Sequence, residues 1–136
     1  MTPNGNEIAF KEFYVDFSGG ERLARPWTWF TRDGWRHCSI WVALGQNSCI
    51  NVTQTIKGVD IRLYEANVHG MMDILCKERK IVYLPVQVGY VPLHYALFLP
   101  TCVGLCMRMT GKVFNALTPR QYYRKLLANG GFLLGI

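Results

Sequence analysis

The sequence lacks the features that mark several classes of protein. No apolar stretch reaches the roughly 18 to 20 residues of a membrane span, because the longest one, residues 91–103, is interrupted by prolines and polar residues. The first residues do not combine a basic start with an apolar run, so we expect no signal peptide. Repeats and low-complexity segments are also missing. These absences favour one domain over residues 1–136, with a core over about residues 10–127 and no membrane span.

Paired cysteine motifs are missing as well. The five cysteines, at positions 38, 49, 76, 102 and 106, are odd in number and contain no CxxC spacing. A structural zinc site requires closely spaced ligand pairs, and a cluster of Cys102 and Cys106 with His37 and Cys38 lacks them. We therefore expect reduced thiols in a cytoplasmic setting, with no metal and no cofactor.

Acidic residues are absent from the second part of the chain. Residues 1–78 hold eight basic and nine acidic side chains and carry −1, whereas residues 79–136 hold seven basic and no acidic side chains and carry +7, which gives the net +6. A basic region suits nucleic acid, the acidic stem peptides of peptidoglycan or an acidic protein. Arg120, Arg124 and Lys125 lie in one predicted helix, but no nucleic-acid-binding motif accompanies them, so we do not expect nucleic-acid binding.

The pattern of apolar residues predicts an α+β fold with a mainly antiparallel sheet packed against helices. A turn at residues 45–48 joins two of the strands into a hairpin. The predicted strands are residues 10–17, 36–44, 49–55, 58–64 and 81–88. The predicted helices are residues 66–78, 101–110 with a glycine cap at Gly111, and a helix that starts at Thr118 and Pro119 and continues to about residue 129.

The segment around Cys102 is suited to activating a thiol. Pro100 ends an extended approach, and Thr101 is a favourable N-cap for the helix that follows. Cys102 would then lie in the first turn, where unpaired backbone N–H groups and the helix dipole lower the pKa of a thiol. A thiolate at this point is a candidate nucleophile, although most free cysteines are small buried hydrophobes.

A thiol nucleophile requires a base and a polar group that orients this base. His37, on a strand, and His94, in the loop before Cys102, are both chemically suitable, and we favour His37 because a strand holds a side chain more firmly. The returning strand offers Asn51, Thr53 and Gln54, and the first and second of these share one face. Without the register of the hairpin, the amide-bearing Asn51 and Gln54 are our candidates. The backbone N–H of Cys102 would contribute to an oxyanion hole.

The order of these motifs resembles the circularly permuted papain-like hydrolases, which are related to NlpC-type cell-wall peptidases and to the lecithin–retinol acyltransferase group. The motifs are WRHC at residues 35–38, PTCV at residues 100–103 and TPRQYYRKL at residues 118–126. More narrowly, the chain resembles small proteins encoded by tailed bacteriophages and prophages. The resemblance covers about residues 10–127.

The resemblance implies a papain-like permuted fold with Cys102 as nucleophile and His37 as base. It implies a phage-encoded hydrolase of amide bonds, with peptidoglycan as a substrate, in the host cytoplasm before assembly or in the tail or neck of the virion. The alternative is a virion structural or connector protein that keeps the fold with little or no activity. The apolar tail at residues 130–136 has no obvious place in a finished domain, so we expect it to contact other phage structural proteins.

Overall fold

The computed structural model describes residues 12–18, 37–55, 57–85, 102–110 and 115–135. In chain order these residues form β1 (Glu12–Ser18), β2 (His37–Gly45), β3 (Ser48–Thr55), β4 (Gly58–Tyr64), α2 (Val68–Leu75), β5 (Lys80–Pro85), α3 (Cys102–Thr110), α4 (Pro119–Ala128) and β6 (Phe132–Leu133). The strands make one six-stranded sheet in the order β4-β3-β2-β1-β5-β6, and every neighbouring pair is antiparallel. The predicted α+β class with an antiparallel sheet is confirmed.

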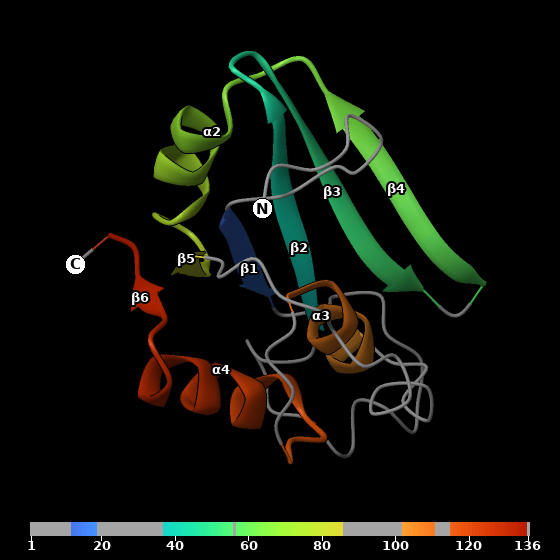
Figure 1. Cartoon of the computed structure of the whole chain (residues 1–136), viewed down its shortest axis with the longest axis vertical. Coiled ribbons are helices and arrows are strands. Elements are labelled where there is room, and N and C mark those ends of the chain that lie inside the picture. Colours follow the sequence, from blue (N-terminus) through green and yellow to red (C-terminus); the bar gives the residue numbers. More distant parts are fainter. Residues whose placement is uncertain (1–11, 19–36, 56, 86–101, 111–114, 136) are drawn as a thin grey trace, which may run out of the picture.

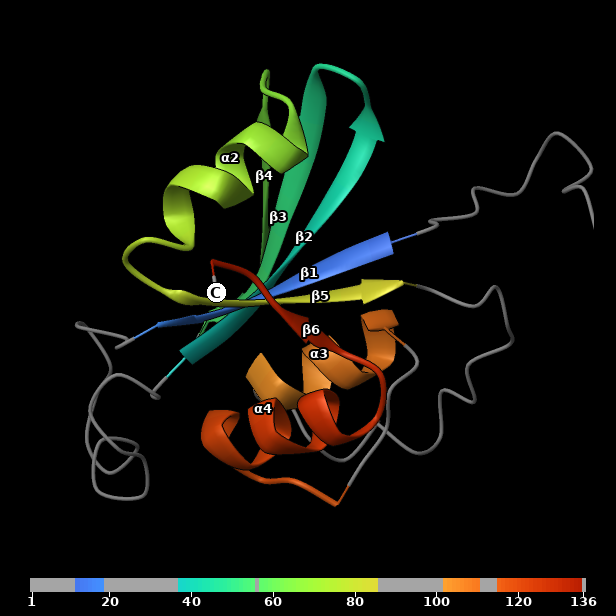
Figure 2. The ribbon, with the colours of Figure 1, turned by 90° about the vertical axis from the view of Figure 1, so that its left-hand side faces the viewer.

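Helices cover both faces of this sheet. Helices α3 and α4 lie against one face, and α2 lies against the other (Figures 1 and 2). Alternation along β1 explains how both faces are apolar, because Phe13, Val15 and Phe17 contribute to the core under α3 and α4, whereas Tyr14 contributes to the core under α2. The central strands are therefore buried on both sides.

Local sequence signals determine where two of the helices begin. Thr118 accepts a hydrogen bond from the backbone N–H of Gln121, and the Gln121 side chain accepts one from the backbone N–H of Thr118, which is a capping box with Pro119 in the first turn. Asn67 caps α2 by accepting from the backbone N–H of Gly70. The predicted start of α4 is confirmed. Thr101 and Gly111, the expected caps of α3, lie outside the described residues.

The C-terminal tail has a place in the fold, which the sequence did not suggest. Phe132 and Leu133 pair with β5 as strand β6, and the backbone N–H of Leu134 donates to the carbonyl of Ile81 at 2.9 Å. The free hydrogen-bonding edge of β5 explains this position, because unpaired strand edges bind further strands. Phe132 remains 60 % exposed. The tail thus belongs to the sheet of this chain, and its contact with other phage structural proteins stays a prediction.

Candidate functional site

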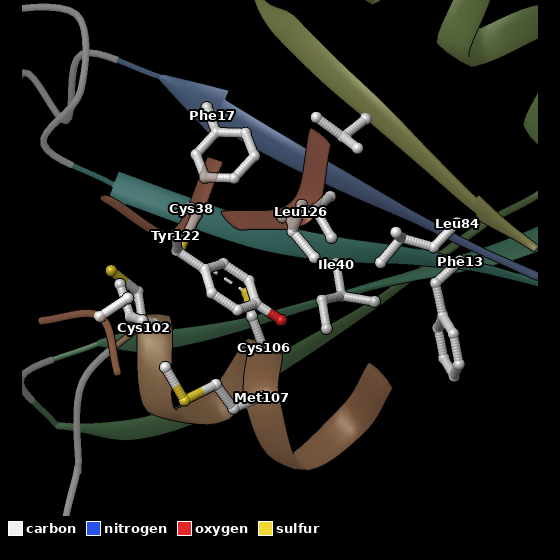
Figure 3. Packing of buried hydrophobic residues seen from close by; sticks show 14 of the residues in the cluster. Phe13, Phe17, Cys38, Ile40, Leu84, Cys102, Cys106, Met107, Tyr122 and Leu126 are labelled. Carbon is white, nitrogen blue, oxygen red and sulfur yellow. Dashed lines mark hydrogen bonds between the residues drawn. The ribbon is translucent and has the colours of Figure 1, made fainter. Parts of the chain in front are cut away.

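Cys102 is the first residue of α3, and its side chain points toward the sheet. It is 6 % exposed and belongs to the core cluster under α3 and α4, together with Cys106 and Met107 of the same helix (Figure 3). Cys38 of β2 also belongs to this cluster. The start of α3 is thus held against the beginning of β2, where the WRHC motif ends.

Three thiols meet at this point. The Cys106 thiol donates to the Cys38 sulfur at 3.6 Å, and Cys102 belongs to the same buried cluster. Burial, together with these neighbouring thiols, raises the pKa of Cys38 well above its usual value. Cys38 therefore stays protonated and can donate its S–H to the sulfur of Cys102.

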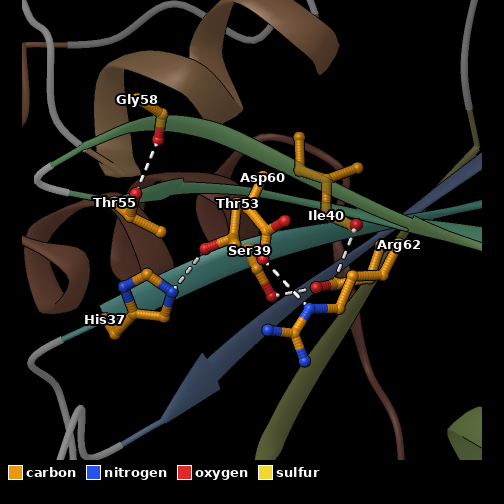
Figure 4. A network of polar contacts seen from close by, with 9 residues as sticks. His37, Ser39, Ile40, Thr53, Thr55, Gly58, Asp60 and Arg62 are labelled. Atoms are coloured by element: carbon orange, nitrogen blue, oxygen red, sulfur yellow. Dashed lines mark hydrogen bonds and ion pairs between the residues drawn. The ribbon is translucent and has the colours of Figure 1, made fainter. Parts of the chain in front are cut away.

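His37 is the first residue of β2 and is held by the neighbouring strand. Its Nε2 lies 2.6 Å from Oγ1 of Thr53 on β3 (Figure 4). The register explains the contact, because the pairing of Ile40 with Val52 places Thr53 opposite Ser39 and therefore diagonal to His37. His37 is also one of the groups whose hydrogen bonding and charge lower the pKa of Cys102.

These neighbours change the acidity of Cys102. Chiefly the hydrogen bond from Cys38, and also the hydrogen bond and positive charge of His37 and the backbone N–H of Cys38, lower the pKa of Cys102 to about 5. Burial of the sulfur acts in the opposite direction. The thiolate, which is the nucleophilic form of cysteine, therefore predominates at neutral pH.

Asn51 and Gln54 do not hold His37, and here the sequence-based assignment needs correction. Nδ2 of Asn51 donates to Ser39 Oγ at 3.1 Å and to the carbonyl of Ile40 at 3.2 Å. Nε2 of Gln54 donates to the carbonyl of Thr55 at 3.1 Å. Thr53 makes the contact instead, because the register brings it to His37. The hairpin register is the signal that would have identified Thr53.

Local sequence patterns did not predict the role of Cys38, whose thiol is the largest influence lowering the pKa of Cys102. Successive side chains along a strand point to opposite faces of the sheet. Cys38 follows His37 on β2, and it points to the face that α3 covers. The alternative base His94 lies outside the described residues.

The arrangement suits nucleophilic chemistry at an acyl group. A thiolate nucleophile works with an imidazole that carries the proton and with a polar group that orients this imidazole. Backbone N–H groups in the first turn of a helix lack partners within that helix, and such groups can stabilise an oxyanion. Cys102, His37 and Thr53 come from α3, β2 and β3.

Within the described residues, no group of three or more histidine, cysteine, aspartate or glutamate side chains is arranged to hold a metal ion. In the same part of the chain, no helix has the length and apolar character needed to cross a membrane. Comparison of the chain with protein-family models, with curated proteins and with solved structures finds no match.

Proposed function

We propose that this protein is a thiol hydrolase of amide bonds that acts through Cys102 and His37. The observation that carries the proposal is the hydrogen bond of His37 Nε2 with the Thr53 hydroxyl at 2.6 Å, in a histidine that also lowers the pKa of Cys102 at the start of α3. A nucleophile, a base and a group that orients the base are the parts that such catalysis needs. The lowered pKa of Cys102 provides the thiolate at neutral pH.

The proposed reaction has two steps. The Cys102 thiolate attacks the carbonyl carbon, the backbone N–H of Cys102 stabilises the oxyanion, and His37 transfers its proton to the leaving amine as the C–N bond breaks. A thioester joins the acyl group to Cys102. His37 then removes a proton from a water that attacks the thioester, and the carboxylic acid leaves as the thiol is restored. Thr53 keeps the imidazole oriented throughout.

The substrate class and origin that we propose follow from the charge and from the resemblance of the motifs. Residues 79–136 carry +7 with no acidic side chain. This charge favours an acidic substrate, and the stem peptides of peptidoglycan combine acidic groups with amide bonds. A papain-like permuted fold encoded by a tailed bacteriophage agrees with the order of helix and strand motifs and with this substrate.

The experiment that tests the proposal uses purified peptidoglycan and an alkyne-bearing iodoacetamide probe. We expect the wild type to release soluble amines from peptidoglycan and to be labelled at Cys102. Cys102→Ala is expected to lose both properties. Cys49→Ala is the matched control, because it removes a buried thiol from the core on the other face of the sheet and should keep both. Equal labelling of the wild type and Cys102→Ala would refute the proposed nucleophile.

A second candidate function, a structural subunit of the virion, is favoured by the exposed surface of β4. Val59, Ile61 and Leu63 of this edge strand are each more than half exposed. They alternate along the strand and therefore share one face. An apolar row beside a strand edge suits assembly with another protein. If this function is correct, replacing Ile61 by lysine should abolish incorporation into particles, and normal incorporation would exclude it.

A further inference from the structure

A pocket separate from the thiol site lies between α2 and the sheet. It has a volume of about 670 Å³. Its floor is formed by strand residues that include Trp41 and Tyr64, whose ring centroids lie 5.1 Å apart. Its other wall is one face of α2, formed by residues at i, i+3, i+4 and i+7, namely Asn67, Gly70, Met71 and Ile74. The volume is within the range of small-molecule sites.

One end of the pocket is polar, and its hydrogen bonds are incomplete. Asp16 lines the pocket and is 2 % exposed. Its Oδ2 accepts from Nε1 of Trp41 at 3.2 Å and from Nη1 of Arg79 at 2.8 Å. Its Oδ1 is buried and has no hydrogen-bond partner among the residues that the structure describes. A buried carboxylate oxygen without a donor is costly, so this atom marks a position that a ligand group can satisfy.

The charges around this end specify the ligand further. Arg79 neutralises Asp16, so the site does not require a cation. Ser39 and Asn51 also line the pocket, and the Asn51 amide donates to the Ser39 hydroxyl, which leaves the hydroxyl hydrogen to be donated elsewhere. The polar end therefore offers both an acceptor and a donor. An uncharged amide carries the two complementary groups.

The rest of the pocket is apolar and has an unfilled side. Ile74 is 67 % exposed although it lines the pocket. A Cβ atom placed on Gly70 would meet no other atom within 4 Å. Inside a helix, glycine lowers stability by up to about 1 kcal/mol relative to alanine. Gly70 therefore does not strengthen α2, and it leaves open space at the centre of this helical face. An apolar group of a ligand fits this space.

We propose that the pocket between α2 and the sheet binds a small uncharged ligand that carries an amide next to an apolar side group. The amide N–H donates to Asp16 Oδ1, directly or through one bridging water, and the apolar group lies beside Gly70 and Ile74. The site does not include Cys102 or His37. The inference therefore stands independently of the proposed hydrolase activity.

N-Acetyl-leucinamide is a suitable probe, because it is uncharged and combines amides with an isobutyl group. We would titrate it into the ¹⁵N-labelled full chain and follow the amide resonances of α2, β2 and β3. We expect saturable shifts with a dissociation constant on the order of millimolar, which is usual for so small a ligand. N-Acetyl-leucine, which replaces the terminal amide by a carboxylate, should bind at least tenfold more weakly. Absence of saturable shifts with N-acetyl-leucinamide would overturn the proposal.

Two variants locate the site and a third serves as control. Gly70→Leu places a side chain in the open space and should abolish binding, whereas Gly70→Ala should leave the dissociation constant within threefold. In Asp16→Asn the side-chain oxygen accepts the hydrogen bonds from Trp41 and Arg79. The Nδ2 group, which is a donor, then takes the place of the Oδ1 acceptor. This variant should bind at least tenfold more weakly. Wild-type affinity of Gly70→Leu, or of Asp16→Asn, would contradict the assignment.

Discussion

Replacing Thr53 by valine removes the hydroxyl whose Oγ1 lies 2.6 Å from Nε2 of His37. Valine has nearly the shape of threonine and is equally suited to a strand. A hydrogen bond to a charged group contributes about 1.5 to 3 kcal/mol. Because about 1.4 kcal/mol corresponds to one pH unit, loss of this bond can raise the pH at which the Cys102 thiolate forms by at most about two units.

The assay for this prediction is the rate of iodoacetamide alkylation at Cys102 as a function of pH, followed by mass spectrometry of the Cys102 peptide. For the wild type the rate should fall below pH 5, because the thiol is protonated below its pKa of about 5. For Thr53→Val the midpoint should be higher, up to about 7. Thr53→Ser keeps the hydroxyl and should retain the wild-type midpoint. An unchanged midpoint in Thr53→Val would refute the orienting role of Thr53.

Two further predictions concern Cys38 and Gly131. Cys38→Ala removes the thiol that donates to Cys102, so the alkylation midpoint should rise by at least one pH unit, and a midpoint that stays near 5 would contradict this contribution. A Cβ on Gly131 would lie 2.7 Å from Val82 Cγ1 and 2.8 Å from the Leu126 carbonyl oxygen, so Gly131→Ala should lower the free energy of unfolding in urea by about 1 to 3 kcal/mol. Gly70→Ala, which meets open space, is the control and should not destabilise the protein.

Local signals in the sequence were sufficient for most of the secondary structure. The β2–β3 hairpin follows from its turn and its alternating apolar residues, and the start of α4 follows from Thr118 and Pro119. The position of Cys102 at the start of a helix and of His37 at the start of a strand also follows from local patterns. Each of these features depends on residues that are close together in the chain.

The features that could not be predicted depend on contacts between distant segments. Thr53 meets His37 because of the exact hairpin register, which the turn residues alone do not determine. The contact of Cys38 with Cys102 depends on which face of the sheet α3 covers. The pairing of the tail with β5 depends on that strand having a free edge. The hydrogen bonds that Trp41 and Arg79 donate to the Asp16 carboxylate also join residues that are far apart in the chain.

The acidity of Cys102 is the central claim, and the thiolate absorbance at 240 nm measures it directly. The pH titration of the wild type, minus that of Cys102→Ala, isolates one sulfur because the other four cysteines are common to both proteins. We expect one step in the difference, centred near pH 5. A step near pH 8.5, the value of an ordinary thiol, would show that the pKa of Cys102 is not lowered.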